Sequence, residues 1–400
     1  MKEVLVSRTI AWFMWGVASI FYAYQYILRV MPNIIFEDII AQFNIDAAVF
    51  GQFSGVYYIG YSLMHLPIGI MLDRYGPRKI MTGCILLTVV GLLPILFSNS
   101  WEYPLLGRAF IGIGSSAAIL GTFKIIRMSF PEKKFTRMLS LSVTIGLIGA
   151  IYGGGPVSYM CSSLGYKTVI EIFAILGVLL AIMTYIIVPE IKNETKTTIF
   201  SDIKLVFTNF KVIALCLSAG LMVGPLEGFA DVWGTQFFKQ VYGFDQSLAS
   251  YLPSIIFIGM CFGAPVLSMI AEKTGYYMGS IIGAGVLMFT AFVALTTKTL
   301  DLSGITISFL IVGVCCAYQI LAIYKASTYV PENVAGLTTA VANMIIMIFG
   351  YAFHTTIGFV IQAFGGINDA SSFVYGINVI PITLGIGILG FSMLAYQEKR

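Results

Sequence analysis

Long apolar stretches alternate with short polar ones along the whole chain. A helix needs about 20 mostly apolar residues to cross a bilayer, and twelve stretches come close to or exceed that length. The twelve expected spans cover residues 10–31, 50–71, 79–97, 103–126, 138–160, 168–189, 211–236, 249–270, 277–297, 303–325, 336–363 and 373–395. The pattern therefore predicts an all-α integral membrane protein.

The composition agrees, because 58% of the 400 residues are hydrophobic and only 10% are charged, whereas soluble domains carry about 25% charged residues. The first stretch follows Lys2 and Arg8, as a signal peptide would follow basic residues. It is nevertheless long, contains Trp and Tyr, and lacks a small-residue cleavage site. We therefore expect it to be the first spanning helix.

Lysine and arginine collect on the cytoplasmic side of membrane proteins, and this bias predicts the orientation. With the N-terminus inside, 18 of the 23 basic residues fall on the cytoplasmic side. Both termini are then cytoplasmic, and the chain is expected in the cell inner membrane. The net charge of +4 reflects this bias, so we expect the lipid bilayer as a partner and no nucleic acid.

The most polar internal stretch divides six expected spans from six. We expect an N-terminal bundle over residues 1–189, a cytoplasmic linker over 190–210 and a C-terminal bundle over 211–400. The halves also repeat each other. The charged turn at residues 73–76 recurs at 272–275, an offset of 199, and a Pro-Glu pair after the fourth span recurs after the tenth at an offset of 200.

A charged turn between the second and third spans carries the most specific pattern. It follows G-x-x-x-D-R-x-G-x-R-K, with Gly69, Asp73, Arg74, Gly76, Arg78 and Lys79 at the fixed positions. This turn resembles the loop between helices 2 and 3 of the major facilitator superfamily. The resemblance implies twelve helices in two pseudo-symmetric six-helix bundles, a solute site between them near the midplane, and a gating role for the turn on the cytoplasmic face. The alternative is an ordinary basic loop.

Two further stretches resemble superfamily motifs. Arg108 precedes Gly112 and Gly114 in the fourth span, and the resemblance assigns Arg108 to gating. These glycines form no nucleotide loop, because neither a strand nor a P-loop lysine accompanies them. In the fifth span, the glycines at 153–155 precede Pro156 and predict a kinked or closely packed helix.

Charged groups inside a membrane are expensive and usually face a cavity or a partner. Arg29 lies late in the first span, where it either binds a substrate anion or extends to the outer headgroups. The stretch from Tyr26 to Arg29 resembles helix 1 of organic-anion symporters, in which the arginine binds the anion. Those symporters often carry an aspartate just before the arginine, where this chain has Leu28.

Two carboxyls lie in the seventh span, in the stretch Gly-Pro-Leu-Glu-Gly-Phe-Ala-Asp at 224–231. Glycine and proline interrupt the helix, as they do at transporter binding sites, and residues four apart share a helical face. Burial favours the neutral form of a carboxyl and so suits it to bind and release a proton. Glu227 is the first choice for proton coupling. Asp231 is the second, with solvation near the outer end of the span as its alternative.

Arg29 and Glu227 belong to opposite halves and are suited to hold the carboxylate and the ammonium of a zwitterion. Further substrate-binding candidates are Tyr26, Tyr57, Tyr61, Tyr251, Gln319 and Asn343. A wider set either lines the pathway or only packs between helices, and it includes Tyr58, His65, Tyr318 and His354.

The sequence thus predicts a secondary active transporter that takes up a small polar metabolite with protons by alternating access, and an amino acid is the favoured substrate. It resembles bacterial nutrient importers, including those that take up amino acids from a phagosome. An organic anion or sugar-phosphate carrier is the alternative, and a drug exporter the third possibility. No nucleophile–base pair, metal-ligand cluster or C-x-x-C pair indicates an enzyme, a metal site or another cofactor, and a monomer is expected.

Overall fold

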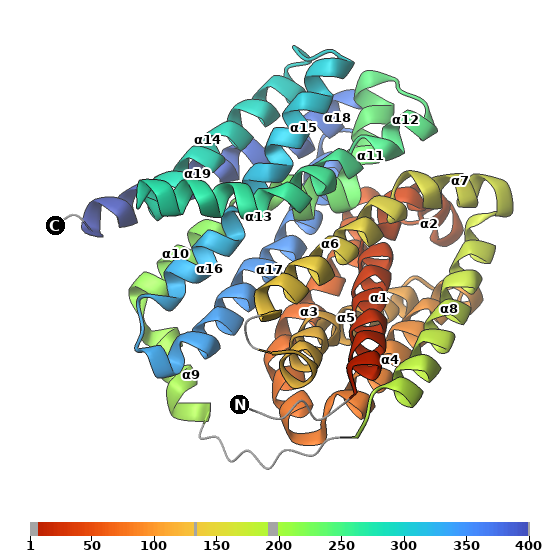
Figure 1. Ribbon diagram of the computed structural model, residues 1–400. Helices are drawn as coiled ribbons and strands as arrows, with labels where there is room; N and C mark the ends of the chain where they lie inside the picture. Colours follow the sequence, from red (N-terminus) through yellow and green to blue (C-terminus); the bar gives the residue numbers. More distant parts are fainter. Residues whose placement is uncertain (1–6, 132–133, 191–198, 399–400) are drawn as a thin grey trace.

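Helices form all the regular structure in the residues that the computed structural model describes, which are 7–131, 134–190 and 199–398. They are arranged in two bundles, drawn from red to yellow and from green to blue in Figure 1. Helix α17 of the second bundle packs against α3 of the first, and this contact forms the longest seam between them.

The first bundle contains α1 (Arg8–Ile34), α3 (Ala47–Tyr75), α4 (Pro77–Phe97), α5 (Glu102–Ser129), α6 (Phe135–Gly153) continued by α7 (Gly155–Leu164), and α8 (Tyr166–Ile187). The short helix α2 (Phe36–Phe43) follows α1, and α9 (Ile199–Thr208) lies within the stretch expected to be a linker. Residues 191–198 of that stretch lie outside the described residues.

The second bundle begins with a broken span made of α10 (Phe210–Gly220), the π-helix η2 (Gly224–Trp233), α11 (Gly234–Phe237) and a second π-helix, η3 (Phe238–Tyr242). It continues with α12 (Gln246–Tyr251) and α13 (Ser254–Thr274), α14 (Tyr277–Thr296), α15 (Leu302–Cys316) and α16 (Tyr318–Ser327), α17 (Glu332–Ala363), and α18 (Ala370–Ile377) with α19 (Val379–Glu398).

Each of the twelve expected spans coincides with one helix or with a run of consecutive helices. Within the described residues, ten are long and apolar enough to cross a membrane, and α6 with α7 makes an eleventh. The twelfth is α1, whose 27 residues are long enough but include the polar run from Tyr22 to Tyr26. The prediction of a twelve-helix membrane fold is confirmed.

The fifth span bends where the sequence places its glycines. The axes of α6 and α7 differ by 40° at the break. A Cβ on Gly154 would press on the hydroxyl of Ser254, and a Cβ on Gly155 would overlap the ring of Tyr251. The predicted kink is therefore confirmed, and it lets α7 approach α12 of the other bundle.

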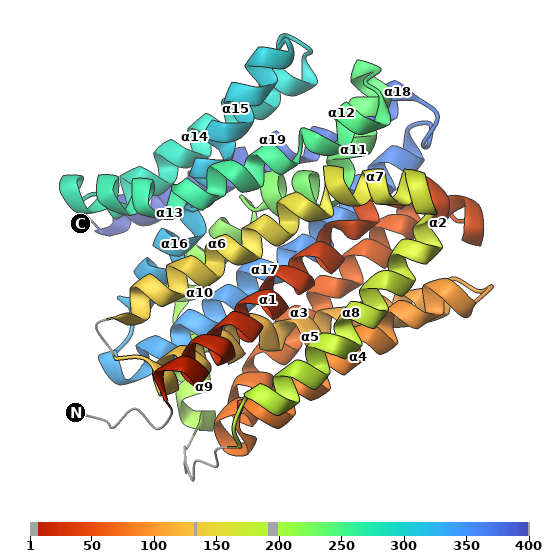
Figure 2. The same cartoon turned by 45° about the vertical axis from the view of Figure 1, so that its right-hand side comes forward.

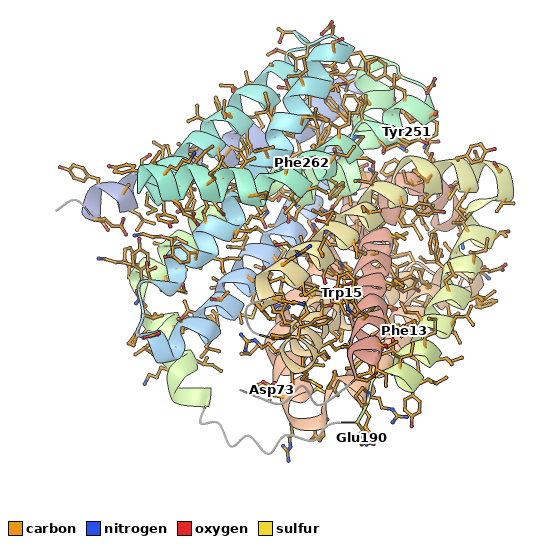
Figure 3. The ribbon with its side chains drawn as sticks, in the orientation of Figure 1. Phe13, Trp15, Asp73, Glu190, Tyr251 and Phe262 are labelled. Carbon is orange, nitrogen blue, oxygen red and sulfur yellow. The ribbon has the colours of Figure 1, made fainter. Side chains whose placement is uncertain are left out.

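The spans end at two opposite faces of the molecule. The linker face is the end at which α3 turns into α4 and α8 ends, and the distal face is the end formed by α2, α7, α12 and α18 (Figure 2). Figure 3 shows Asp73 and Glu190 at the linker face and Tyr251 near α12 at the distal face.

Helices α3 and α5 cross at close range because glycines stand at the contact. A Cβ on Gly112 of α5 would overlap the backbone carbonyl of Tyr57, and a Cβ on Gly60 of α3 would overlap that of Ala109. Small residues let helices approach closely in lipid. This crossing sets the relative position of α3 and α5, which carry residues of the site described below.

We predict that Gly112→Val destabilises the protein by about 1–3 kcal/mol, because the added side chain overpacks the crossing. The matched control is Gly83→Val on α4, where a Cβ meets nothing within 4 Å, so its effect should stay within about 0.5 kcal/mol. Thermal unfolding in detergent, followed by intrinsic fluorescence, measures both. Equal midpoints for the two variants would contradict the prediction.

Candidate functional site

Arg29 points from the distal part of α1 into the contact between the two bundles. Its Nε lies 2.6 Å from Oδ2 of Asp231, and its Nη2 lies 3.4 Å from Oε1 of Glu227. Only 7% of the residue is exposed. A side chain that extended to the headgroups would be exposed, so the alternative that Arg29 snorkels is wrong.

The two carboxyls come from a π-helix that replaces the middle of the seventh span. The α-helical part ends at Gly220, and η2 starts at Gly224 with Pro225, which has no N–H to donate. π-Helical turns are rare and frequent at functional sites. Both Glu227 and Asp231 are buried and face Arg29. The alternative that water solvates Asp231 is therefore wrong.

The surroundings of the two carboxyls differ. Asp231 accepts hydrogen bonds from the Arg29 guanidinium and from the hydroxyl of Tyr58 on the same oxygen, Oδ2. Glu227 accepts only long bonds from Nε2 of Gln319, at 3.3 and 3.4 Å. The backbone carbonyl of Glu227 lies 2.5 Å from Nε2 of His354, which makes that nitrogen the protonated one. Asp231 is thus firmly held, and the Glu227 carboxyl is loosely held.

Aromatic rings enclose the charges. The guanidinium carbon of Arg29 lies 5.1 Å from the ring centres of both Tyr26 and Tyr58. Aromatic faces attract cations, and they do so more strongly when the cation is desolvated. The rings also exclude water, so the ion pairs act through a low local dielectric.

Two atoms of this group have no hydrogen-bond partner among the described residues. One is Nη2 of Arg29, which is within ion-pair range of Glu227 but not in hydrogen-bond geometry, and the other is Oδ1 of Asp231. Buried polar atoms are normally satisfied. The group therefore retains one unused donor on a cation and one unused acceptor on an anion.

Three regularly spaced pairs connect α1 and the following α2 with the segment from η2 to η3, and we call them the polar ladder. They are Arg29–Asp231, Asn33–Thr235 and Glu37–Lys239, and each pair is separated by 202 residues. The Oδ1 of Asn33 accepts from the backbone N–H of Thr235 at 3.1 Å, and Nζ of Lys239 lies 2.5 Å from Oε1 of Glu37. The steps are four residues, or about one helical turn, on both sides. In the first half the charge changes from positive at Arg29 to negative at Glu37. In the second half it changes from negative at Asp231 to positive at Lys239.

The outer end of the ladder holds a further titratable group. Burial and the neighbouring Glu37 raise the pKa of Asp38 on α2, against the lowering effect of Lys239.

An aromatic cluster lies between the ladder and the α3–α17 seam. The rings of Phe36, Phe50 and Trp233 pack edge to face, with centres 4.6–5.7 Å apart, and all three are buried. Since these rings come from both halves, the cluster helps to hold the distal face closed.

Among the residues that the structure describes, no ion pair near the linker face joins the two bundles. Lys124–Asp73 lies within the first bundle, Lys325–Glu398 lies within the second, and Lys79 of α4 pairs with Glu190 shortly after α8. The ladder, in contrast, joins the two halves toward the distal face. The conformation is thus one in which polar contacts tie the bundles together on the distal side.

Most residues predicted to gate lie at or near the turn between α3 and α4, whereas Arg108 lies on α5, buried against the backbone of α1. Gly76 has φ +82°, which glycine adopts readily, so the predicted tight turn is confirmed. A glycine at position 69 would suit a close helix approach, but a Cβ there would meet only a methyl of Leu120 at 3.9 Å, so that interpretation of Gly69 is wrong. The guanidinium of Arg74 lies 5.4 Å from the ring of Tyr75, and that of Arg78 lies over Tyr185 at 4.0 Å. Gating by this turn stays a prediction.

The structure brings some predicted substrate residues to the charge group and leaves others apart. Gln319 and Tyr26 belong to it. Tyr57 instead donates to Oε1 of Gln25, and Tyr61 stacks on Tyr57 next to half-buried Asn343.

Tyr251 is not brought to the group. It is 48% exposed at the distal end, where its ring packs on Gly155. Tyr251 is the last residue of α12, in the first turns of a span that starts at the distal face and continues into α13.

Sequence reasoning missed Asn33 and ranked Tyr58 and His354 too low. Asn33 is a short polar residue about one helical turn after Arg29, so its polarity on the same face as Arg29 was the available signal for it. Tyr58 was indistinguishable from its neighbour Tyr57, because adjacent residues on a helix point about 100° apart and the sequence does not reveal which one faces the other half.

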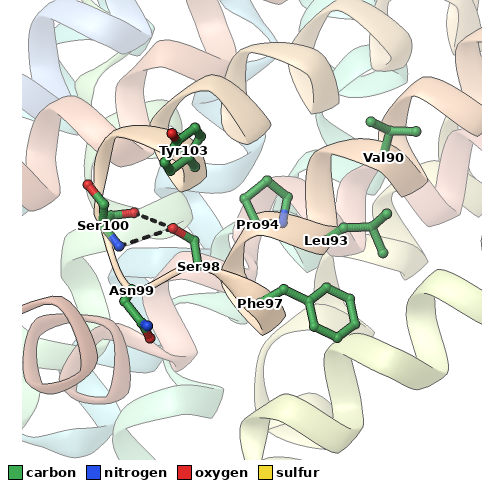
Figure 4. A pocket seen from close by; sticks show the side chains of 8 residues that line it. All are labelled: Val90, Leu93, Pro94, Phe97, Ser98, Asn99, Ser100 and Tyr103. Atoms are coloured by element: carbon green, nitrogen blue, oxygen red, sulfur yellow. Dashed lines mark hydrogen bonds between the residues drawn. The ribbon is translucent and has the colours of Figure 1, made fainter.

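A pocket of about 640 Å³ lies away from this group, at the distal end of α4 and α5 (Figure 4). Its apolar lining includes Val90, Leu93 and Phe97, and its rim is the turn at Ser98 and Ser100, whose hydroxyl and backbone groups are hydrogen bonded. Val90, Leu93 and Phe97 are exposed on the outside of the bundle. The pocket therefore faces the surroundings of the bundle and not the charge group.

Twelve apolar spans in two bundles, with a buried charge group between them, define a multi-pass membrane transporter. The Major Facilitator Superfamily matches residues 9–354, and the chain belongs to that family. The nitrite extrusion protein of Bacillus subtilis (strain 168) is 21% identical over 359 residues, which cover 84% of this chain and 85% of that protein. The multidrug transporter MdfA of Yersinia pestis is 25% identical over 193 residues, 47% of each chain.

Two solved structures share the fold. A bacterial homologue of the human lysosomal transporter Spinster, in an inward-facing and unoccupied conformation, has a TM-score of 0.74 and 18% identity, over 98% of this chain and 96% of that one. A mutant of the nucleoside transporter NupG has a TM-score of 0.77 and 15% identity, over 95% and 99%. The chain is therefore a transporter and not an enzyme, and the predicted superfamily membership is confirmed.

We predict that reversing one charge in the outer rung of the ladder loosens the distal face and that reversing both restores it. In Glu37→Lys or Lys239→Glu, like charges face each other. An exposed pair contributes about 0.2–1 kcal/mol, so each single variant should raise the fraction of molecules with an open distal face by a factor of about 1.4 to 5. Spin labels at exposed Ala41 and Ser371 report the distance across the distal face. The double variant should return the distribution to that of the parent.

The labelling uses a parent in which the two half-buried cysteines, Cys161 and Cys261, are replaced by serine. Charge reversal of Asp245, which caps α12 on the same face, is the control for a general change of surface charge. Single variants that leave the distance distribution unchanged would show that the outer rung does not hold the face.

Proposed function

We propose that the chain is a secondary active carrier that takes up a small polar metabolite together with protons by alternating access, and that the substrate is an amino acid. The observation that carries the proposal is the buried group in which Arg29 faces Asp231 and Glu227 of the opposite half. Its unused donor on Arg29 and unused acceptor on Asp231 match the carboxylate and the ammonium of a zwitterion.

The balance of charge supports proton coupling. Two carboxylates lie within ion-pair range of one guanidinium, and a second buried cation, Arg108, donates to backbone carbonyls instead. The two carboxylates therefore share one close counter-charge unless a proton is bound. An unpaired charge in a buried, low-dielectric site is expensive. With one proton bound the group is neutral, and a neutral zwitterion then enters without changing the balance. A simple anion would add an unpaired charge, which favours an amino acid over the anion alternative.

Glu227 is the better carrier of that proton. Asp231 receives the Arg29 and Tyr58 donors at close range, which stabilise its ionised form. Glu227 has only the long contacts to Gln319 and Arg29. In this proposal Asp231 and Arg29 bind the substrate, whereas the sequence had paired Glu227 with Arg29 for that purpose.

Direction follows from the expected orientation. If the basic linker face is cytoplasmic, the closed distal face is the outer one, and the conformation is ready to release substrate inward. Uptake then requires the polar ladder and the aromatic cluster to open. Protonation of Glu227 removes one of the two charges that draw Arg29 toward the second half, which weakens this contact when substrate and proton arrive from outside.

The rival functions are an organic anion or sugar-phosphate carrier and a drug exporter. The Bacillus subtilis relative is described as extruding nitrite, and other relatives as drug transporters, which supports keeping both rivals. An anion carrier would use Arg29 alone. It would therefore tolerate loss of Asp231, which the proposed carrier does not.

We predict that Glu227→Gln loses proton-driven accumulation of amino acids by about tenfold or more, the effect of one missing interaction of 1.4 kcal/mol, but keeps exchange across the membrane. Glutamine resembles protonated glutamate and cannot release a proton. Asp231→Asn should lose both activities, because the substrate ammonium loses its partner. Uptake of labelled amino acids into proteoliposomes with an inward proton gradient, and counterflow without one, measure the two activities.

Glu272→Gln near the end of α13 is the control, because this exposed carboxyl lies outside the group. Organic anions are run separately. Proton-driven uptake at parental levels in Glu227→Gln would overturn the assignment of the proton site. Uptake of anions alone, unaffected by Asp231→Asn, would replace the proposal with the anion carrier.

A further inference from the structure

Arg108 is buried inside the first bundle, and its hydrogen bonds go to backbone carbonyls. It is 2% exposed. Its Nη1 donates to the carbonyl of Leu28 at 2.8 Å, and its Nη2 lies 3.4 Å from the carbonyls of Arg29 and Ser54. Burying a cation is costly, so these carbonyls are unusual partners that require an explanation.

The explanation lies four residues further along α1. Pro32 stands inside that helix and has no N–H, so it leaves unused the carbonyl of residue 28, and its ring pushes that carbonyl outward. The carbonyl that Arg108 binds at 2.8 Å is that of Leu28. The second carbonyl, that of Arg29, is the next hydrogen-bond acceptor along α1 and lies in the same turn that Pro32 opens. Carbonyls near the end of a helix also carry partial negative charge, which favours a nearby cation.

Arg29 is the residue whose backbone this contact fixes. Its carbonyl accepts from Arg108 while its guanidinium reaches Asp231. A helix with an unsatisfied turn at this position would be free to change its bend, and a small change of bend displaces a long side chain by more than a hydrogen bond tolerates.

We propose that Pro32 and Arg108 act as a compensating pair: Pro32 opens the turn of α1 beneath Arg29, and Arg108 closes it and so positions Arg29 for Asp231 and Glu227. Arg108 is thus a positioning residue of the transport site and contributes through hydrogen bonds to the α1 backbone. The inference deepens the proposed function and rests on it for the role of Arg29, while the pairing of Pro32 with Arg108 stands on the helix geometry alone.

The test is a double-mutant cycle. Arg108→Met keeps the length of the side chain but removes every donor, and it should lower proton-driven uptake about tenfold or more, as expected for one unsatisfied buried carbonyl. Pro32→Ala restores an N–H to the turn and should keep uptake within about twofold of the parent. In the double variant the new N–H satisfies Leu28, so the loss caused by Arg108→Met should shrink to about threefold or less.

Two controls separate this role from others. Pro67 also lies inside a helix of the same bundle, α3, so Pro67→Ala should not rescue Arg108→Met. Arg108→Lys keeps the charge without the two-pronged geometry and should remain impaired. Rescue by lysine together with failure of Pro32→Ala to rescue would overturn the proposal and assign Arg108 an electrostatic role.

A readout independent of the substrate separates this inference from the proposed function. The thermal midpoint of purified protein in detergent should fall in Arg108→Met and fall less when Pro32→Ala is present. If the parent transports no amino acid, the proposed function fails. The double-mutant cycle measured on thermal midpoints then still decides whether Pro32 and Arg108 act as a pair. Additive shifts of the midpoint would refute the pairing even if uptake is as proposed.

Discussion

A charge buried between helices in a membrane needs an opposite charge close by, and this requirement organises the whole contact between the two halves. Arg29 belongs to one half and its carboxylate partners, Asp231 and Glu227, to the other. Breaking a buried pair leaves an uncompensated charge, at a cost of about 3–5 kcal/mol. The halves therefore cannot separate on the distal side unless protons or a charged ligand take over the interaction. The same physical constraint makes the group both the tie between the halves and the candidate binding site.

The internal repeat explains why such a tie is geometrically simple. Helices related by an approximate twofold axis meet at equivalent positions, so partners recur at a constant sequence offset, here 202 residues. The charges of the two halves run in opposite order, with Arg29 and Glu37 on one side and Asp231 and Lys239 on the other, so both charged rungs are attractive.

Much of the fold and part of the site could be predicted from the sequence. Span number, the kink at Gly154 and the choice of Arg29 and the acids of the seventh span as site candidates depend on apolar length, on glycine and on the cost of buried charge, all of which are local properties. The place of Tyr251 at the distal end of its span depended on how that helix lies lengthwise in the bundle, and the choice of Tyr58 over Tyr57 depended on the rotation of α3. Those depend on packing between distant segments, which apolar periodicity does not encode.

Irregular backbone near the site is tolerated because other helices satisfy it. Inside a bilayer an unpaired carbonyl costs several kcal/mol, so a broken helix persists only where a neighbour supplies a donor. In the first half Arg108 of α5 donates beside Pro32, and in the second His354 of α17 bonds the carbonyl of Glu227 within η2. Each half therefore presents its charged residues from a helix that is locally distorted and held by a side chain from a second helix. Since those holding helices differ, the first and seventh spans can move relative to each other while each keeps its own support, which is what a carrier that alternates between two open sides requires.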